Sequence, residues 1–128
     1  ENSTKTHECI MKALIVDDTS YIRNDIREIL ERHGYDVIEA ENGAEAVEIY
    51  KEQNPDLVTM DINMPKIHGL RATQMITNYD PNAKIIICST MVALSNYIKL
   101  GKEAGAKAFL SKPFSEKELL TEIEKLNL

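Results

Sequence analysis

A run of four apolar residues followed at once by two acids decides the fold: Ala13-Leu14-Ile15-Val16-Asp17-Asp18. The run is too short for a helix, and it is apolar at successive positions rather than at alternate ones. That pattern is typical of a strand buried on both faces of a parallel sheet. Asp17 and Asp18 then follow the end of the strand, at the edge of the sheet where such folds bind ligands.

Four more short apolar runs follow along the chain. They cover residues 37–40, 57–60, 85–88 and 108–110. The segments after the runs carry apolar residues at helical spacing, and the pattern is weakest in the third of them, about residues 70–78. No linker, repeat or low-complexity stretch interrupts this alternation, which predicts five βα units in one α/β domain.

Residues typical of helix ends agree with the alternation. Asn42 with Glu45, and Ser115 with Glu118, have the spacing of a helix N-cap and its partner three residues on. Gly34 and the pair Asn54-Pro55 are typical of positions just after a helix ends. Each of them lies between a predicted helix and a predicted strand.

Composition narrows the possible functions. The 128 residues include 15 basic and 21 acidic side chains, which give a net charge of −6. An acidic chain binds the phosphate backbone poorly, so we expect no nucleic-acid partner. No apolar run approaches the roughly 20 residues that cross a bilayer, so we expect no membrane span. Cys9 and Cys88 form no CxxC or zinc pattern, and we expect a cytoplasmic protein. Residues 1–10 are interpreted as an unstructured leader or cloning remnant, and 11–128 as the folded domain.

The residues at the carboxyl ends of the predicted strands suggest a site. Asp17 and Asp18 follow the first strand and Asp61 the third. Ser89 and Thr90 follow the fourth, and Lys112 the fifth. Right-handed crossovers bring these ends to one rim of a parallel sheet. Taken singly, each of these residues is more simply explained as a turn former, a helix cap or a solvated charge.

Taken together, the three acids predict a bound cation. Close carboxylates repel each other by several kcal/mol per pair at an effective dielectric constant of about 20. Lys112 alone cannot compensate three such charges, and oxygen ligands favour Mg²⁺, with Mn²⁺ as the other possibility. Because Mg²⁺ commonly bridges carboxylates and phosphoryl oxygens, we expect phosphoryl transfer, with Asp61 as the nucleophile. Lys112 and either Ser89 or Thr90 would then contact the phosphoryl oxygens.

Five ordered stretches resemble a known family. They are LIVDDTSYIR (14–23), AENGAEA (40–46), DLVTMDINMP (56–65), AGA (104–106) and KPF (112–114). Together they span residues 12–126, and they are similar to response-regulator receiver domains, in particular to single-domain receivers of the chemotaxis type. The resemblance implies a doubly wound, flavodoxin-like (βα)5 fold with strand order 2-1-3-4-5.

The resemblance also implies the site and its chemistry. Asp61 accepts a phosphoryl group from a histidine kinase, or slowly from small donors. Asp18 binds Mg²⁺ directly, Asp17 acts mostly through water, and the Asn63 backbone carbonyl is a further ligand. Lys112 contacts the phosphoryl oxygens, and the bond from Lys112 to Pro113 is expected to be cis. The resemblance implies that the domain catalyses only its own phosphorylation and dephosphorylation and is not otherwise an enzyme.

Signalling is expected to follow from a two-state switch. The switch hydroxyl is Ser89, with Thr90 as the alternative, and Phe109 is the aromatic that turns inward after phosphorylation. The output face is expected over residues 92–126. Since the sequence ends at Leu128 with no output domain, we expect a monomer that binds a motor or adaptor protein. Met91 is apolar where a polar group could orient water, so we expect slow self-dephosphorylation.

Other functions remain alternatives at this point. An intermediate of a multistep phosphorelay would use the same residues. An aspartate-nucleophile phosphatase would also combine acids with Mg²⁺, although it would usually add a substrate-selecting lid. A flavodoxin-like electron carrier needs a phosphate-binding loop where this chain has Asp17 and Asp18. A scaffold that binds its partners constitutively would show no Mg²⁺-dependent response to a phosphoryl mimic.

Overall fold

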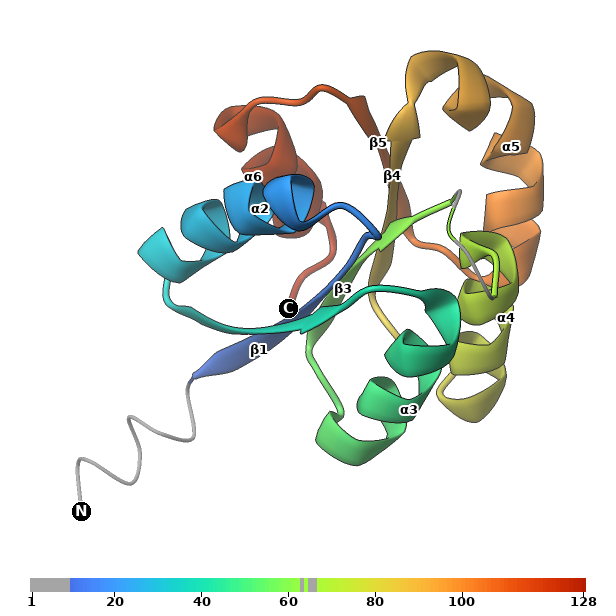
Figure 1. Cartoon of the computed structure of the whole chain (residues 1–128), viewed down its shortest axis with the longest axis horizontal. Coiled ribbons are helices and arrows are strands. Elements are labelled where there is room, and N and C mark those ends of the chain that lie inside the picture. Colours follow the sequence, from blue (N-terminus) through green and yellow to red (C-terminus); the bar gives the residue numbers. More distant parts are fainter. Residues whose placement is uncertain (1–9, 63, 65–66) are drawn as a thin grey trace.

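The computed structural model describes residues 10–62, 64 and 67–128, in which strands and helices alternate (Figure 1). The elements are β1 (Met11–Val16), α2 (Ser20–Arg32), β2 (Tyr35–Ala40), α3 (Gly43–Gln53), β3 (Leu57–Asp61), α4 (Gly69–Tyr79), β4 (Ile85–Thr90), α5 (Met91–Ala104), β5 (Ala108–Lys112) and α6 (Glu116–Lys125). The predicted leader, residues 1–10, lies outside the described residues except for Ile10.

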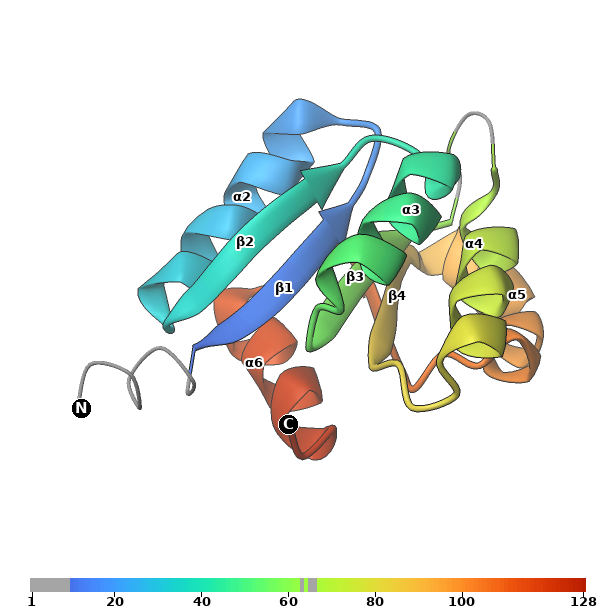
Figure 2. The ribbon, with the colours of Figure 1, turned by 90° about the horizontal axis from the view of Figure 1, so that it is seen from below.

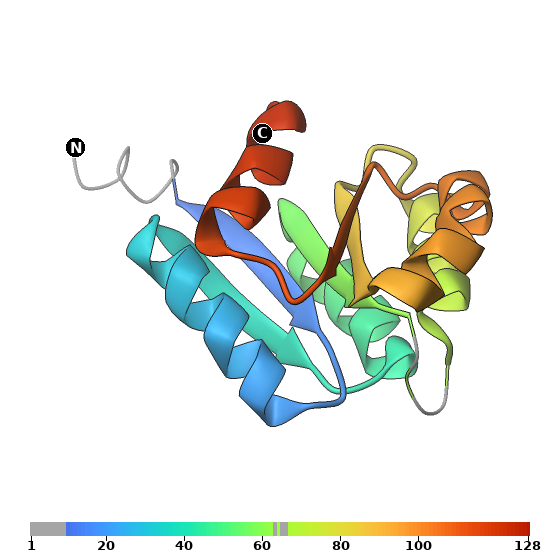
Figure 3. The same cartoon turned by 90° about the horizontal axis from the view of Figure 1, so that it is seen from above.

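The sheet has the doubly wound arrangement. Its five strands pair in the order β2-β1-β3-β4-β5, and every pair is parallel. Seen from below, α3 and α4 lie in front of the sheet (Figure 2), whereas from above α2 and α6 lie in front of it (Figure 3). The fold class and the strand order expected from the sequence are therefore confirmed.

The core is divided by the sheet. One apolar cluster joins the strands to α2 and α6, with Ile26, Leu30 and Leu119 buried in it. A second joins the strands to α3 and α4, and a third, smaller cluster lies under α5. Both faces of the central strands are therefore buried, which explains why their sequences are apolar at successive positions.

The strands extend beyond the apolar runs. β1 begins at Met11 and β2 at Tyr35, and these two residues pair in the register. At the other edge, β4 continues to Thr90 and β5 to Lys112, and these two also pair. Asp61 likewise ends β3, so the predicted place after the strands is corrected for four residues, which lie within the strand ends: Asp61, Ser89, Thr90 and Lys112. Backbone pairing continues where side chains are polar, so hydropathy alone does not mark these ends.

The helix caps agree with the predictions, with one difference. Ser115 and Glu118 form a reciprocal capping box at the start of α6. At α3 the Asn42 side chain accepts a hydrogen bond from the Glu45 amide, but the Glu45 carboxylate accepts from the amide of Glu41. α3 ends at Gln53, and its C-cap Asn54 has a left-handed backbone.

Gly69 lets the start of α4 lie directly against the end of β3. Its amide donates to the carbonyl of Ile62 over 2.8 Å. A Cβ at this position would lie 2.0 Å from the Asp61 carbonyl oxygen, so no side chain fits unless the backbone moves. Gly43 is similarly close to the segment between β3 and α4, since its Cβ would lie 2.3 Å from the Ile67 carbonyl oxygen.

Within the described part of the chain, no helix combines the length and the apolar character that a membrane span needs.

We expect Gly69→Ala to destabilise the protein by about 2 to 3 kcal/mol, because the new methyl group forces the Asp61 carbonyl to move. Gly34→Ala is the control: a Cβ there meets no atom within 4 Å, so its cost comes from the left-handed backbone of Gly34 alone, with φ +88°. This control should cost about 1 kcal/mol. Urea denaturation followed by circular dichroism measures both, and equal losses would show that the contact with Asp61 is unimportant.

Candidate metal centre at the carboxyl edge of the sheet

The carboxyl ends of β1, β3 and β5 bring three acids and a lysine together. One carboxylate oxygen each from Asp17, Asp18 and Asp61 lies within 4.8 Å of the others. The Lys112 ammonium donates to Asp17 Oδ2 over 2.6 Å and to Asp61 Oδ1 over 3.2 Å. The strand order explains this meeting, since β1 and β3 are neighbours where the winding of the sheet reverses.

Asp17 is held by hydrogen bonds at each of its polar atoms. Its amide donates to Ala40 over 3.1 Å, and its carbonyl accepts from Arg23 over 2.7 Å. Its carboxylate accepts from the Thr19 amide over 2.9 Å and from Lys112 over 2.6 Å. The residue is 3% exposed. Both carboxylate oxygens therefore already have donors, and the side chain has little freedom to turn.

Asp18 has a different environment. It is exposed, and among the described residues its carboxylate has one hydrogen-bond donor, the Thr19 hydroxyl at 3.4 Å. The Asp18 oxygens are therefore available to a ligand, whereas those of Asp17 are occupied.

The pKa of the Asp61 carboxyl lies above that of an ordinary aspartate. Its side chain is 12% exposed. Burial raises the pKa of Asp61 to about 6; Lys112 opposes this rise, and the neighbouring charges of Asp17 and Asp18 add to it. Burial lowers the pKa of Lys112, but its bonds to Asp17 and Asp61 outweigh this, and the pKa lies above its ordinary value. Negative charge at Asp61 is therefore costly until a further cation is present.

The cluster fits a hard divalent cation. Three carboxylates and one ammonium leave a net charge of two negative units (three minus one) in a small space. The donors are all oxygens, which suit Mg²⁺ better than zinc or copper. The predicted fourth contributor, Asn63, lies outside the described residues, so the structure does not place its carbonyl.

The two hydroxyls at the end of β4 differ in environment. Ser89 is 3% exposed and pairs with Ser111 of β5. Thr90 is exposed, and its hydroxyl accepts a hydrogen bond from the Ala93 amide as the N-cap of α5. The buried hydroxyl is thus Ser89, while that of Thr90 starts a helix.

Phe109 and Met91 differ in exposure. The Phe109 ring belongs to the apolar cluster under α5, where a Cβ at Gly101 would lie 2.6 Å from it. Met91 is the first residue of α5 and 70% exposed. The Lys112–Pro113 peptide bond is cis, as the resemblance implies.

Arg23 is a residue of this region to which the sequence analysis gave no role. It is one of three buried residues of α2, with Ile26 and Leu30. The signal was present, because Arg23 precedes these two by three and seven residues and so belongs to the same stripe. A charged residue in a buried stripe needs partners, and one of them is the Asp17 carbonyl.

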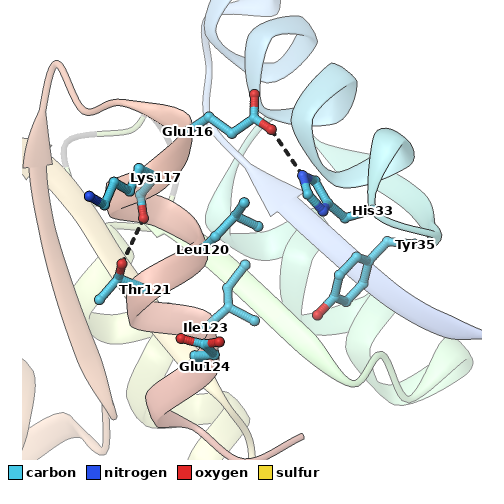
Figure 4. Close-up of a pocket in the computed structure, with 8 residues that line it drawn as sticks. All are labelled: His33, Tyr35, Glu116, Lys117, Leu120, Thr121, Ile123 and Glu124. Carbon is cyan, nitrogen blue, oxygen red and sulfur yellow. Dashed lines mark hydrogen bonds and ion pairs between the residues drawn. The ribbon is translucent and has the colours of Figure 1, made fainter.

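A sizeable cavity lies away from the acid cluster. It has a volume of about 730 Å³ and lies between α6 and the start of β2 (Figure 4). It includes the ion pair of His33 with Glu116, 2.9 Å apart, and the apolar side chains of Leu120 and Ile123. None of the three clustered acids lines it.

We expect Asp61→Asn to stabilise the metal-free protein at pH 7.5 by about 1 to 3 kcal/mol. Asp61 keeps its proton in the folded protein up to about pH 6, but loses it near pH 4 when unfolded, so wild-type stability falls as pH rises through this window. Urea denaturation in EDTA at pH 4.5 and 7.5 measures the effect, which should fall to about a third of its size at the lower pH. The control is Asp25→Asn, at an exposed position of α2. A gain that is the same at both pH values would contradict the burial argument.

Comparison with known proteins places the chain in a family. The sequence profile of the response regulator receiver domain matches residues 13–124. The chemotaxis protein CheY of Bacillus subtilis is 49% identical over 115 residues, 89% of this chain and 95% of that protein. CheY of Thermotoga maritima is 46% identical over 117 residues, 91% and 97% of the two chains.

The structural comparison agrees. A crystal structure of the complex of CheX and CheY with BeF3 and Mg²⁺ from Borrelia burgdorferi matches with a TM-score of 0.86 at 32% identity, over 92% of this chain and 90% of that one. Sequence profile, relatives and fold therefore agree, and the chain belongs to the response regulator receiver domain family.

Proposed function

We propose that this receiver domain is a phosphorylation-activated switch of the chemotaxis type. It takes a phosphoryl group from a histidine kinase onto Asp61 with the help of Mg²⁺, and it then binds a target protein such as a motor component. The observation that carries this proposal is the buried Asp61 carboxylate, crowded by two other acids and contacted by Lys112 at 3.2 Å. Receiver domains are generally not enzymes, and we propose only self-phosphorylation and self-dephosphorylation here.

The transfer is a displacement at phosphorus. An Asp61 carboxylate oxygen attacks the phosphorus atom of a phosphohistidine, the P–N bond breaks, and the imidazole nitrogen keeps the electron pair and takes up a proton. Lys112, already between Asp17 and Asp61, balances the charge on the phosphoryl oxygens. Bound Mg²⁺ would supply further charge neutralisation and orient the phosphoryl group.

The hydrogen bonds support a division of roles between the adjacent acids. Among the described residues the Asp18 carboxylate accepts one long hydrogen bond, at 3.4 Å from Thr19, and Asp18 is proposed to bind Mg²⁺ directly, with Asp61 and the Asn63 carbonyl as the other protein ligands. The Asp17 oxygens already accept from Thr19 and Lys112, which supports a contact to the metal through water.

The environments of the β4 hydroxyls support Ser89 as the switch. Phosphorylated Asp61 carries new acceptor oxygens, and the buried Ser89 hydroxyl is proposed to move towards them. Phe109 then turns towards the space that this movement leaves, away from its contact with Gly101 of α5. The change is thereby passed to the output face over residues 92–126.

The output face presents apolar side chains to solvent. Val92 is 74% exposed, and Ile98 and Leu100 are also exposed on α5. The relatives are named chemotaxis proteins, and one neighbouring CheY is described in a complex with CheX. These observations support a protein target for this face, and a chemotaxis-type kinase as the donor.

Beryllofluoride with Mg²⁺ tests the proposed function. We expect amide NMR shifts at Asp61 and Lys112 and over α5 and β5, because the mimic completes the charge balance of the site. Asp61→Asn should abolish the response, whereas Asp25→Asn, at an exposed position, should keep it. A wild-type protein that does not respond to beryllofluoride and Mg²⁺ would contradict the proposal.

Ser89→Ala should uncouple the site from the output face. We expect beryllofluoride to shift the amides around Asp61 as before, while the shifts over α5 fall to less than about half, because the hydroxyl that moves is missing. Thr90→Ala is the matched variant, which removes a helix cap and should keep the coupling. The opposite outcome, with only Thr90→Ala uncoupled, would assign the switch to Thr90.

A further inference from the structure

Arg23 is a buried cation next to the acid cluster. It is 8% exposed and belongs to the face of α2 that packs on the sheet. A guanidinium in such a place is costly unless its donors find acceptors. The acceptors of the Arg23 guanidinium therefore indicate its role.

The Arg23 guanidinium joins three elements. Its Nη1 donates to the carbonyl of Asp17, just after β1, over 2.7 Å. Its Nε donates to Oε1 of Glu39 on β2 over 2.6 Å. The side chain, which comes from α2, thus links the loop that carries Asp17 and Asp18 to a strand of the sheet.

Glu39 is a firm anchor for this link. Its second oxygen accepts from Arg27 Nε over 2.6 Å, and Arg27 also pairs with Glu31 over 2.7 Å. Burial raises the pKa of Glu39, but the bonds from Arg23 and Arg27 outweigh it, and the pKa lies below its ordinary value. Glu39 therefore stays ionised wherever the acid cluster would bind a metal.

Arg23 contacts the backbone carbonyl oxygen of Asp17. The Asp17 carbonyl belongs to the peptide unit that joins Asp17 to Asp18, and a peptide unit is planar. Fixing this oxygen therefore fixes the orientation of the peptide plane and, with it, the position of the Asp18 Cα atom. Asp18 depends on this, because its own side chain has one long hydrogen bond, at 3.4 Å, among the described residues.

We propose that Arg23 is a positioning residue of the metal site, which holds the Asp17–Asp18 peptide against Glu39 so that the acids are aimed at Mg²⁺. The inference rests on the proposed function, since it takes the three acids as the Mg²⁺ site. A planar guanidinium is suited to this task, because its donors reach two acceptors in a fixed geometry.

The test measures how much Mg²⁺ stabilises each variant. Free energies of unfolding from urea titrations in EDTA and over a Mg²⁺ series yield the dissociation constant from the Mg²⁺-dependent gain. A residue that acts only on the stability of the fold shifts all curves equally and leaves this gain unchanged. Direct calorimetric titration of the folded proteins with MgCl₂ provides a second reading.

Arg23→Met and Arg27→Met are matched variants. Each removes one guanidinium from Glu39, but only Arg23 contacts Asp17. We expect Arg23→Met to raise the Mg²⁺ dissociation constant about tenfold, as loss of an outer partner of a metal ligand does. Arg27→Met should change it about twofold or less, since its pairs are partly exposed.

Arg23→Lys provides the test where Arg23→Met does not fold. A single ammonium cannot hold the Asp17 carbonyl and Glu39 in the same geometry, so we expect the dissociation constant to rise about threefold or more. Wild-type affinity in a folded Arg23 variant would overturn the inference, and so would equal losses in Arg23→Met and Arg27→Met. A wild-type protein that gains no stability from Mg²⁺ would instead overturn the proposed metal site itself.

Discussion

The mutual repulsion of three carboxylates at one edge of the sheet is the constraint on which the rest of this structure depends. The strand order brings Asp17, Asp18 and Asp61 within 4.8 Å of one another, and Lys112 compensates only part of their charge. The raised pKa of Asp61 expresses the same conflict, since burial and its neighbours disfavour a further negative charge. A site of this kind is chemically incomplete by itself, which suits a protein that responds to a cation and a phosphoryl group.

The surrounding backbone keeps this unfavourable arrangement in place. Asp17 is bonded at its amide, its carbonyl and both carboxylate oxygens, so it cannot turn away from the cluster. At the end of β3, Gly69 leaves no space between the start of α4 and the Asp61 carbonyl. Fixed groups of this sort lose little freedom when a ligand binds, which favours binding.

Much of the fold and of the candidate site could be predicted from residue patterns, because burial on both faces makes the strands apolar throughout. The strand ends could not, since pairs such as Thr90 with Lys112 are made by backbone atoms that hydropathy does not report. The place of Arg23 in the buried stripe of α2 could be predicted, but its partners could not. Its partners are a carbonyl oxygen and a glutamate on β2, and nothing in local spacing connects α2 to either of them.

The cap of α5 has a mechanical consequence. Thr90, whose hydroxyl begins this helix, is joined to Ser89 by a single peptide bond, and the first turn of α5 follows without an intervening loop. The movement proposed for Ser89 would therefore also displace the first turn of the 14-residue helix α5. The rigidity of the peptide unit between Ser89 and Thr90 would then determine how much of a displacement in β4 reaches α5.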